Sequence, residues 1–303
     1  MVPIRDEWRM RLLLRKVSQR IVLVALLAGC GAETPVPESG PAPSAPGGTL
    51  VLGVDALAIG EALPTADLER AFRALESDGV EVGRIRNQAV DVLVLILDLR
   101  RVEPAVIGAN LEGARGVTAV SASARSGMRV VVGSSFVSQL NSLSPVGLLR
   151  IEGREMNAIQ AHGYRRVLGV RPDGLSVVGH RAYHADMFDS ALQVGPGVVE
   201  EGLLDITERD LQRTRYLRSF VATCGTRALA GISLIPVHLF SLGQALIEFS
   251  TSRELGCDEV VNLAGDREAV LGLTDGKRLA YFGHPLTSKV ALITFSERGP
   301  DAH

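Results

Sequence analysis

One apolar run, VDVLVLILDL at Val90–Leu99, constrains the fold more than any other segment of this chain. Its charged residues, Asp91 and Asp98, lie near its ends, and aliphatic residues fill the positions between them. A strand with one solvated face would alternate apolar and polar residues, so this run is typical of a central strand buried on both faces. A second apolar run, Met128–Val132, predicts another buried strand.

Turn-forming residues divide the middle of the chain into short apolar segments. Such turns predict β-hairpins, because each lies between two runs of the length and composition of a strand. The last apolar run, Lys289–Phe295, predicts a final strand. The turns are Glu152-Gly153, Pro172-Asp173-Gly174, Glu201-Gly202 and Thr274-Asp275-Gly276-Lys277.

Three segments are predicted to be helices. Thr65–Asp78 places its apolar residues on one helical face with Thr65 as a possible N-cap, and Thr118–Arg125 is a short helix of small residues. Ser241–Leu255 is the clearest helix, and a predicted strand, Val260–Leu263, follows it directly. Because hairpins and helices are interleaved, we expect an α+β fold, a mixed β-sheet with hairpins flanked by helices.

The composition is that of a globular protein, with 46% hydrophobic and 22% charged residues in 303. No second linker interrupts residues 49–297, so we expect one domain there and a short tail at 298–303. The first 29 residues contain six basic and two acidic residues, which leaves 26 basic and 32 acidic residues in the rest of the chain. Nucleic-acid binding is not expected, because it requires clustered Lys and Arg.

The beginning of the chain has the pattern of a secretory leader. A basic segment precedes the apolar run Ile21–Ala28, which is about 12 Å long as a helix and too short to cross a membrane. Residues 1–29 are therefore predicted to be a signal peptide. The Leu-Ala-Gly-Cys sequence that ends at Cys30 resembles the bacterial lipoprotein box. This resemblance implies lipidation of Cys30 and a membrane-anchored lipoprotein that faces the periplasm or the cell exterior.

Residues 30–48 are rich in Pro, Gly and Ser, which is the composition of an extended tether. The alternative is an ordinary signal peptide in which Cys30 has no special role.

Familiar cofactor and metal signatures are missing from the sequence. It contains no dinucleotide, Walker, zincin or Gly-x-Ser-x-Gly motif, and we predict no cofactor. His180 and His184 have the spacing of a metal pair, but they follow a turn-rich stretch where this spacing does not align side chains, so we predict no metal site. Cys224 and Cys257 are compatible with a disulfide or with two buried thiols.

Five short motifs occur in an order that resembles the phosphodiester glycosidase domain, over about Phe72–Phe295. This family includes the uncovering enzyme, which removes N-acetylglucosamine from a sugar-1-phosphodiester, and bacterial proteins linked to exopolysaccharide. The motifs are FRALESDGVEVGRIR with VDVLVLILDLRR, VVVGSSF, SPVGLLRIEGRE, ALQVGPGVVEEG and LGCDEVVNLAGDREAVLGL.

The chain departs from the family pattern at three places. Val132 stands where the family has an asparagine, and Ala264 stands where it has an aspartate. Asp266-Arg267-Glu268 replaces a Gly-Gly-Ser run. All of these changes fall in the site that the resemblance implies.

The resemblance also implies roles for the matching residues. Arg218 would bind the phosphate through a forked contact, and Asp266, or Glu268 beside it, would replace the missing carboxylate. The alternatives are a solvated strand-end arginine and a solvated charged turn. The residues expected to bind substrate are Ser134, Gly147, Gln193, Asn262 and Gly265.

Three functions remain open at this point. The first is a tethered hydrolase that acts on a sugar-1-phosphodiester or related polysaccharide. The second is a non-catalytic relative that binds carbohydrate or assists envelope assembly on the same fold, for which Val132 and Ala264 argue. The third is a structural envelope lipoprotein without a small ligand.

Overall fold

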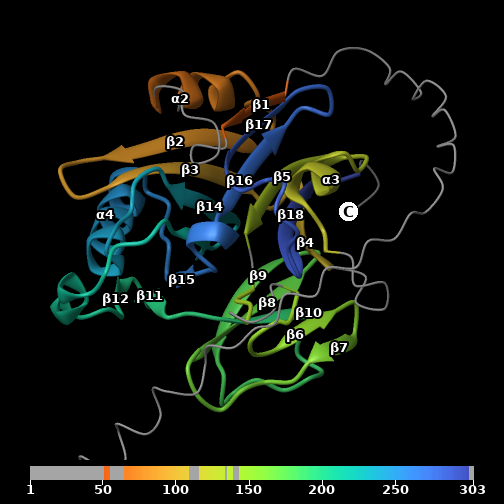
Figure 1. Cartoon of the computed structure of the whole chain (residues 1–303), viewed down its shortest axis with the longest axis vertical. Helices are drawn as coiled ribbons and strands as arrows, with labels where there is room; N and C mark the ends of the chain where they lie inside the picture. Colours follow the sequence, from red (N-terminus) through yellow and green to blue (C-terminus); the bar gives the residue numbers. More distant parts are fainter. Residues whose placement is uncertain (1–50, 55–64, 109–115, 134, 139–142, 300–303) are drawn as a thin grey trace, which may run out of the picture. The chain divides into compact units, whose positions relative to one another are not determined.

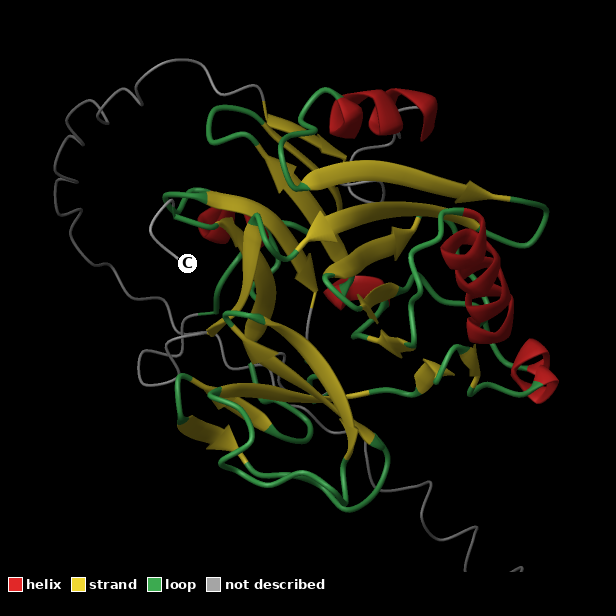
Figure 2. Cartoon of the chain, turned by 180° about the vertical axis from the view of Figure 1, so that it is seen from behind, coloured by secondary structure: helices red, strands yellow, loops and turns green. Residues whose placement is uncertain are grey.

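Strands make up most of the regular structure in the computed structural model (Figure 1). Coloured by secondary structure and seen from behind, the chain shows strands throughout and helices at few places (Figure 2). The described residues all belong to one compact unit, Gly47–His303. The structure describes residues 51–54, 65–108, 116–133, 135–138 and 143–299.

A seven-stranded antiparallel sheet contains the strand predicted at Val90–Leu99. This strand is β3 (Asp91–Asp98); its side chains alternate between two apolar clusters, with Leu95 in one and Val94 in the other. Burial on both faces is therefore confirmed. The spatial order is β12 (Leu203–Leu204), β11 (Gly197–Glu200), β15 (Glu259–Asn262), β13 (Ser219–Cys224), β14 (Arg227–Ser233), β3 and β2 (Val80–Arg86).

A six-stranded sheet packs against one face of the seven-stranded sheet. Val130 and Phe295 of the six-stranded sheet belong to the same apolar cluster as Leu95 of β3. Its pairs are antiparallel except for one parallel pair, β1 with β17. The spatial order is β1 (Val51–Val54), β17 (Leu279–Gly283), β16 (Val270–Thr274), β5 (Met128–Gly133), β18 (Ala291–Glu297) and β4 (Val102–Gly108).

A five-stranded antiparallel sheet is built largely from hairpins, and its strands β6, β8, β9 and β10 contact β4. The predicted turns at Glu152-Gly153 and Pro172-Asp173-Gly174 join two of its hairpins, and Glu201-Gly202 and Thr274–Lys277 join hairpins of the other sheets. The spatial order is β7 (Arg154–Asn157), β6 (Leu149–Ile151), β10 (Ser190–Val194), β8 (Arg166–Arg171) and β9 (Gly174–Gly179).

The helices are short and lie at the margins of this arrangement. The helix α4 packs on the second face of the seven-stranded sheet, where Leu242 and Leu246 join the cluster that contains Val94. Thr118 and Ser121 form a capping box at the start of α3, which was not predicted from the sequence. The helices are α2 (Thr65–Arg73), α3 (Ala119–Ser123) and α4 (Leu239–Ser252), with 3₁₀ turns η2 (Glu208–Gln212) and η3 (Asp266–Glu268).

The expectation of an α+β fold with a helix-flanked mixed sheet is wrong. The described residues form three sheets that are almost entirely antiparallel, with only three α-helices. Antiparallel neighbours are joined by tight turns and need no crossover helix, so the chain can cover one sheet with another instead of with helices. The three predicted helices exist. However, α2 and α3 end earlier than their sequence patterns predict, and turns follow both of them.

Candidate functional site

Arg218 lies just before β13 and is fixed there by β14. Its amide donates a hydrogen bond to the Ser233 hydroxyl (2.8 Å), and its carbonyl accepts one from the Ser233 amide (2.8 Å). The half-buried guanidinium stacks on Tyr216, with 4.9 Å between Cζ and the ring centroid. The Nε atom is buried and has no hydrogen-bond partner in the structure. A donor is therefore held in place with nothing in the described protein to accept its hydrogen.

The electrostatic surroundings of Arg218 differ from those of a paired arginine. Burial lowers the pKa of Arg218 from its usual value, and the charges of Asp210 and Asp266 act in the opposite direction. The guanidinium nevertheless remains cationic at neutral pH, because its ordinary pKa lies far above 7. An anionic ligand group would relieve the cost of burying this charge.

Arg218 and Tyr216 line an open pocket of about 490 Å³. Asp210 contributes a carboxylate to its lining, and the Oδ2 atom of Asp210 accepts a hydrogen bond from the amide of Phe240 at the start of α4 (3.2 Å). The sequence did not predict a role for Asp210. Nothing in the run ERDLQRTRYLR indicates that one of its acidic residues lines a pocket while the other is solvated. The pocket thus combines a cation, an aromatic ring and a carboxylate.

Asn262 is almost completely buried at the end of β15. Its Nδ2 atom donates to the carbonyl of Gly195 (3.2 Å), and its amide donates to the carbonyl of Pro196 (3.2 Å), a residue that lines the Arg218 pocket. Its Oδ1 atom has no hydrogen-bond partner. Phe220 pairs with Asn262, so Arg218, two residues before Phe220, projects from the same face of the sheet as Asn262.

Gly265 and Asp266 follow on the same segment. The amide of Leu217, next to Arg218, donates to the Oδ1 atom of Asp266 (3.0 Å), so this carboxylate acts as a clamp on the backbone beside the pocket. A Cβ atom at Gly265 would collide with the carbonyl of Leu217. Ala264 is buried and, two residues after Asn262, lies on the face that carries Arg218. The structure therefore brings Arg218, Asn262, Gly265 and Asp266 together.

Gln193 and Gly147 have structural roles in a different place. The Oε1 atom of Gln193 accepts hydrogen bonds from the amides of Leu148 (3.0 Å) and Gln160 (2.8 Å), and its Nε2 atom donates to the carbonyls of Gln160 and Tyr164 (2.7 Å each). The amide of this fully buried side chain has used its hydrogen-bonding capacity and has none to offer a substrate. Gly147 has a positive φ of 82°, and a Cβ atom there would lie 2.6 Å from the Oε1 atom of Gln193.

The segment around Ser134 is only partly described. Ser134 lies outside the described residues, as do the predicted signal peptide, the tether and Cys30. Val132 is fully buried in β5 and contributes to the core. At Gly133, a Cβ atom would lie 2.8 Å from the carbonyl of Glu268, so β5 approaches η3 closely.

A buried lysine near η3 was not predicted. The Nζ atom of Lys289 donates to the carbonyl of Arg267 (2.5 Å) and lies 3.3 Å from a carboxylate oxygen of Glu268. Burial lowers the pKa of Lys289, and Glu268 opposes this shift. This pair holds η3 in place and gives Glu268, the second candidate for the missing carboxylate, a partner of its own.

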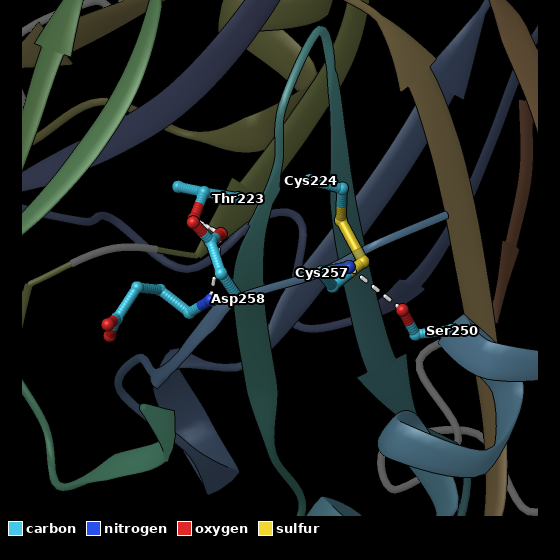
Figure 3. Close-up of a disulfide and its surroundings, with 6 residues drawn as sticks. Thr223, Cys224, Ser250, Cys257 and Asp258 are labelled. Atoms are coloured by element: carbon cyan, nitrogen blue, oxygen red, sulfur yellow. Dashed lines mark hydrogen bonds between the residues drawn. A yellow bond between two sulfur atoms is a disulfide. The ribbon is translucent and has the colours of Figure 1, made fainter. Parts of the chain in front are cut away.

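A disulfide joins Cys224 at the end of β13 to Cys257, just before β15 (Figure 3). The amide of Cys257 donates to the hydroxyl of Ser250 in α4 (2.9 Å), and the hydroxyl of Thr223 donates to the Oδ1 atom of Asp258 (2.7 Å). The sequence left this pairing open. The bond links the ends of β13 and β15 that are opposite to Arg218 and Asn262.

The described part of the chain contains no group of three or more His, Cys, Asp or Glu arranged to hold a metal ion. None of its helices has the length and hydrophobicity needed to cross a membrane.

Comparison with known proteins gives a fold and no family. No known family model matches the sequence, and no curated protein is similar to it. The catalytic domain of zebrafish N-acetylglucosamine-1-phosphodiester alpha-N-acetylglucosaminidase, auto-inhibited by its pro-peptide, matches with a TM-score of 0.53 and 14% identity, over 73% of this chain and 82% of that chain. A hypothetical protein from Synechocystis matches with a TM-score of 0.48 and 12% identity, over 73% of this chain and 63% of that chain. The zebrafish match shows that the two domains share a fold.

Proposed function

We propose that this protein binds a glycosyl phosphodiester in the Arg218 pocket. The observation that carries the proposal is the held, half-buried guanidinium of Arg218, a residue that lines an open pocket and whose buried Nε atom has no protein partner. A guanidinium binds phosphate oxygens through forked, charge-assisted hydrogen bonds. The ring of Tyr216, 40% exposed, offers an apolar face to a sugar. The fold shared with an enzyme named for a sugar-1-phosphodiester supports this choice of ligand.

Hydrolysis of the same ligand is a second candidate function, favoured by the carboxylate of Asp210 in the pocket. Water would add to the anomeric carbon and transfer a proton to the carboxylate, while the bond from that carbon to the phosphate oxygen breaks and its electron pair leaves with the phosphate monoester. Such a leaving group needs little proton donation. Ala264 supplies no carboxylate, so this activity would depend on Asp210.

The test uses the full chain and the α- and β-linked methyl phosphodiesters of N-acetylglucosamine, with affinity and released reducing sugar measured separately. We expect Arg218→Ala to weaken binding at least tenfold, because it removes a charge-assisted contact. The matched control is Arg215→Ala, an exposed arginine outside the pocket. Equal affinity of the wild type and Arg218→Ala would contradict the proposal.

The two functions separate in a second variant. If the protein hydrolyses the diester, Asp210→Asn should abolish sugar release and leave most of the binding. If the wild type binds but does not hydrolyse, Ala264→Asp tests the pseudoenzyme alternative, because position 264 lies on the face that carries Arg218. Turnover gained by Ala264→Asp would identify the natural protein as a binding protein on a glycosidase-like fold.

We also propose that Cys30 is lipidated and that residues 30–48 tether the domain to a membrane. The support is the sequence pattern at Ile21–Cys30. Labelling of bacteria that express the chain with an alkyne fatty acid should mark the wild type and leave Cys30→Ser unlabelled. Equal labelling of both would contradict the anchor.

A further inference from the structure

A second and larger pocket, about 670 Å³, adjoins the Arg218 pocket. Pro196 lines both of them. Its walls come from the start of β8, the end of β9 and the strand β11, together with the loop that precedes β8. We call it the β8–β11 groove. The proposed pocket does not account for it.

The charges that line the β8–β11 groove are unequally satisfied. Both of its carboxylates are paired with one arginine, because Arg166 contacts an oxygen of Glu200 (2.6 Å) and an oxygen of Asp205 (2.8 Å). Arg165 and Arg181 also line the groove, and neither guanidinium has a partner among the described residues. Every unpaired full charge in the groove is therefore positive, although residues 30–303 are acidic as a whole.

Arg165 and Arg181 are exposed at the surface, but the backbone that carries Arg165 is held in place. The amide of His180 donates to the carbonyl of Arg165 (2.9 Å), which extends the β8–β9 ladder by one more pair. The fully bonded side chain of Gln193 fixes the carbonyl of Tyr164, and the ring of Tyr164 stacks on Phe136 with centroids 4.2 Å apart. The cation of Arg165 is thus attached to a braced segment.

The other wall is equally fixed. The hydrogen bonds that Arg166 donates to Glu200 and Asp205 outweigh burial and raise the pKa of Arg166, so this ion-pair cluster stays charged. A Cβ atom at Gly197 would collide with a carboxylate oxygen of Asp205, so any larger residue there would displace the ion-pair cluster. Two braced walls with unpaired cations on one of them form a site suited to anions.

We propose that the β8–β11 groove binds the neighbouring anionic units of a glycan chain whose phosphodiester occupies the Arg218 pocket. The ligand is accordingly a polymer with several negative charges, not a single sugar phosphodiester. This inference rests on the proposed function for the Arg218 pocket and adds the class of ligand. Arg165 and Arg181 contact the additional anionic groups, and Pro196 lies where the chain passes from one pocket to the other.

The test compares ligands of different length and charge on the full chain. The probes are the α-linked methyl phosphodiester of N-acetylglucosamine, a synthetic linear hexamer of N-acetylglucosamine 1-phosphate, hexagalacturonate and neutral maltohexaose. We expect the phosphate hexamer to bind at least tenfold more tightly than the methyl diester. Arg165→Ala/Arg181→Ala should remove that advantage and leave the affinity for the methyl diester unchanged. Arg227→Ala, an exposed arginine outside the groove, is the matched control, and Arg165→Lys/Arg181→Lys should retain part of the advantage.

The outcomes separate the groove from the Arg218 pocket. A hexamer affinity unaffected by Arg165→Ala/Arg181→Ala, or equal binding of maltohexaose, would overturn the groove. Loss of hexamer binding in that variant supports it even if the methyl diester fails to bind, a result that would contradict the Arg218 pocket instead. If the wild type binds hexagalacturonate and the double variant does not, the groove recognises acidic glycans in general. If the wild type binds the phosphate hexamer but not hexagalacturonate, the groove is specific for phosphodiesters. Unchanged thermal unfolding shows that the variants are folded.

Discussion

Two partly buried arginines in this protein have opposite surroundings. Arg84 on β2 is paired with two carboxylates: its Nε and Nη2 atoms each lie 2.8 Å from an oxygen of Asp91, and its Nη1 atom lies 3.0 Å from an oxygen of Glu69. Arg218 beside β13 stacks on Tyr216 and has a buried Nε atom without a partner. One arginine joins parts of the fold, and the other presents a cation to a pocket.

The direction of the pKa shift reflects this difference. The hydrogen bonds that Arg84 donates to Asp91 and Glu69 outweigh burial and raise the pKa of Arg84, whereas burial lowers the pKa of Arg218. A bidentate partner compensates the cost of desolvating a guanidinium, and distant carboxylates do so only in part. An incompletely compensated cation that borders a cavity is therefore a better indicator of a ligand site than burial or charge taken separately.

The largest effect is expected at Arg84. Arg84→Ala leaves Asp91, which is 7% exposed, without its main partner, and should cost about 3 kcal/mol of unfolding free energy. Urea denaturation measures this, with Arg70→Ala on the exposed surface of α2 as the control. The affinity for the methyl phosphodiester should stay unchanged. A loss of unfolding free energy below about 0.5 kcal/mol is what an exposed ion pair contributes. Such a result would show that Arg84 is not a structural arginine and would contradict its contrast with Arg218.

Removal of the disulfide tests whether stability by itself controls binding. Cys224→Ser/Cys257→Ser opens a link between residues 33 positions apart and should cost about 2–3 kcal/mol of stability. Because the link lies at the ends of β13 and β15 away from Arg218, diester affinity at 25 °C should remain within about twofold. If stability and diester affinity fall together in this variant, loss of stability alone is enough to weaken binding. A loss of affinity in Arg218→Ala would then not identify Arg218 as a ligand contact.

Arg218→Ala should give the reverse of the Arg84 result. We expect its unfolding free energy to change by less than about 1 kcal/mol, because no hydrogen bond from the Nε atom is lost. Diester affinity should fall at least tenfold. Chemical denaturation and calorimetric titration of the same preparation give both values, and a destabilisation as large as that of Arg84→Ala would show that Arg218 is structural.

The smallest effect concerns acid. Burial would raise the pKa of Glu69, but hydrogen bonds from Arg84 and Arg73 bring it below its ordinary value of 4.5. A carboxyl group with a lowered pKa in the folded state stabilises the protein above pH 4.5, and this contribution is lost as the pH falls further. Denaturation at pH 6 and pH 4 should therefore show a smaller acid-induced loss in Arg84→Ala than in the wild type. Identical losses would contradict this role for the cluster.

Local patterns predicted the elements better than their assembly. Val90–Leu99 became β3 with burial on both faces, and the turn residues Gly153, Gly202 and Gly276 occupy hairpins with positive φ. The α+β class failed because periodicity identifies the buried faces of a strand and not what covers them. Here another sheet covers one face of β3, and α4 packs on the other.

The site shows the same limit. The motif match selected Arg218, Asn262, Gly265 and Asp266, which do lie together. It also selected Gln193, whose hydrogen bonds are used internally, and it missed Asp210. A sequence shows which residues have suitable chemistry, but it does not show which polar atoms find partners after folding.

The sequence by itself determined the buried strand and the hairpin turns, because these follow from side-chain periodicity and turn chemistry. It pointed to Asn262 and Arg218 only through the motifs that resemble a known family. The tertiary structure decided which charges are satisfied. Arg84 and Arg166 meet carboxylates from other strands and loops, whereas the buried Nε atom of Arg218 has no partner. Since the cost of burying a charge depends on its neighbours in space, only the folded chain distinguishes an arginine that holds the fold from one that is available to a ligand.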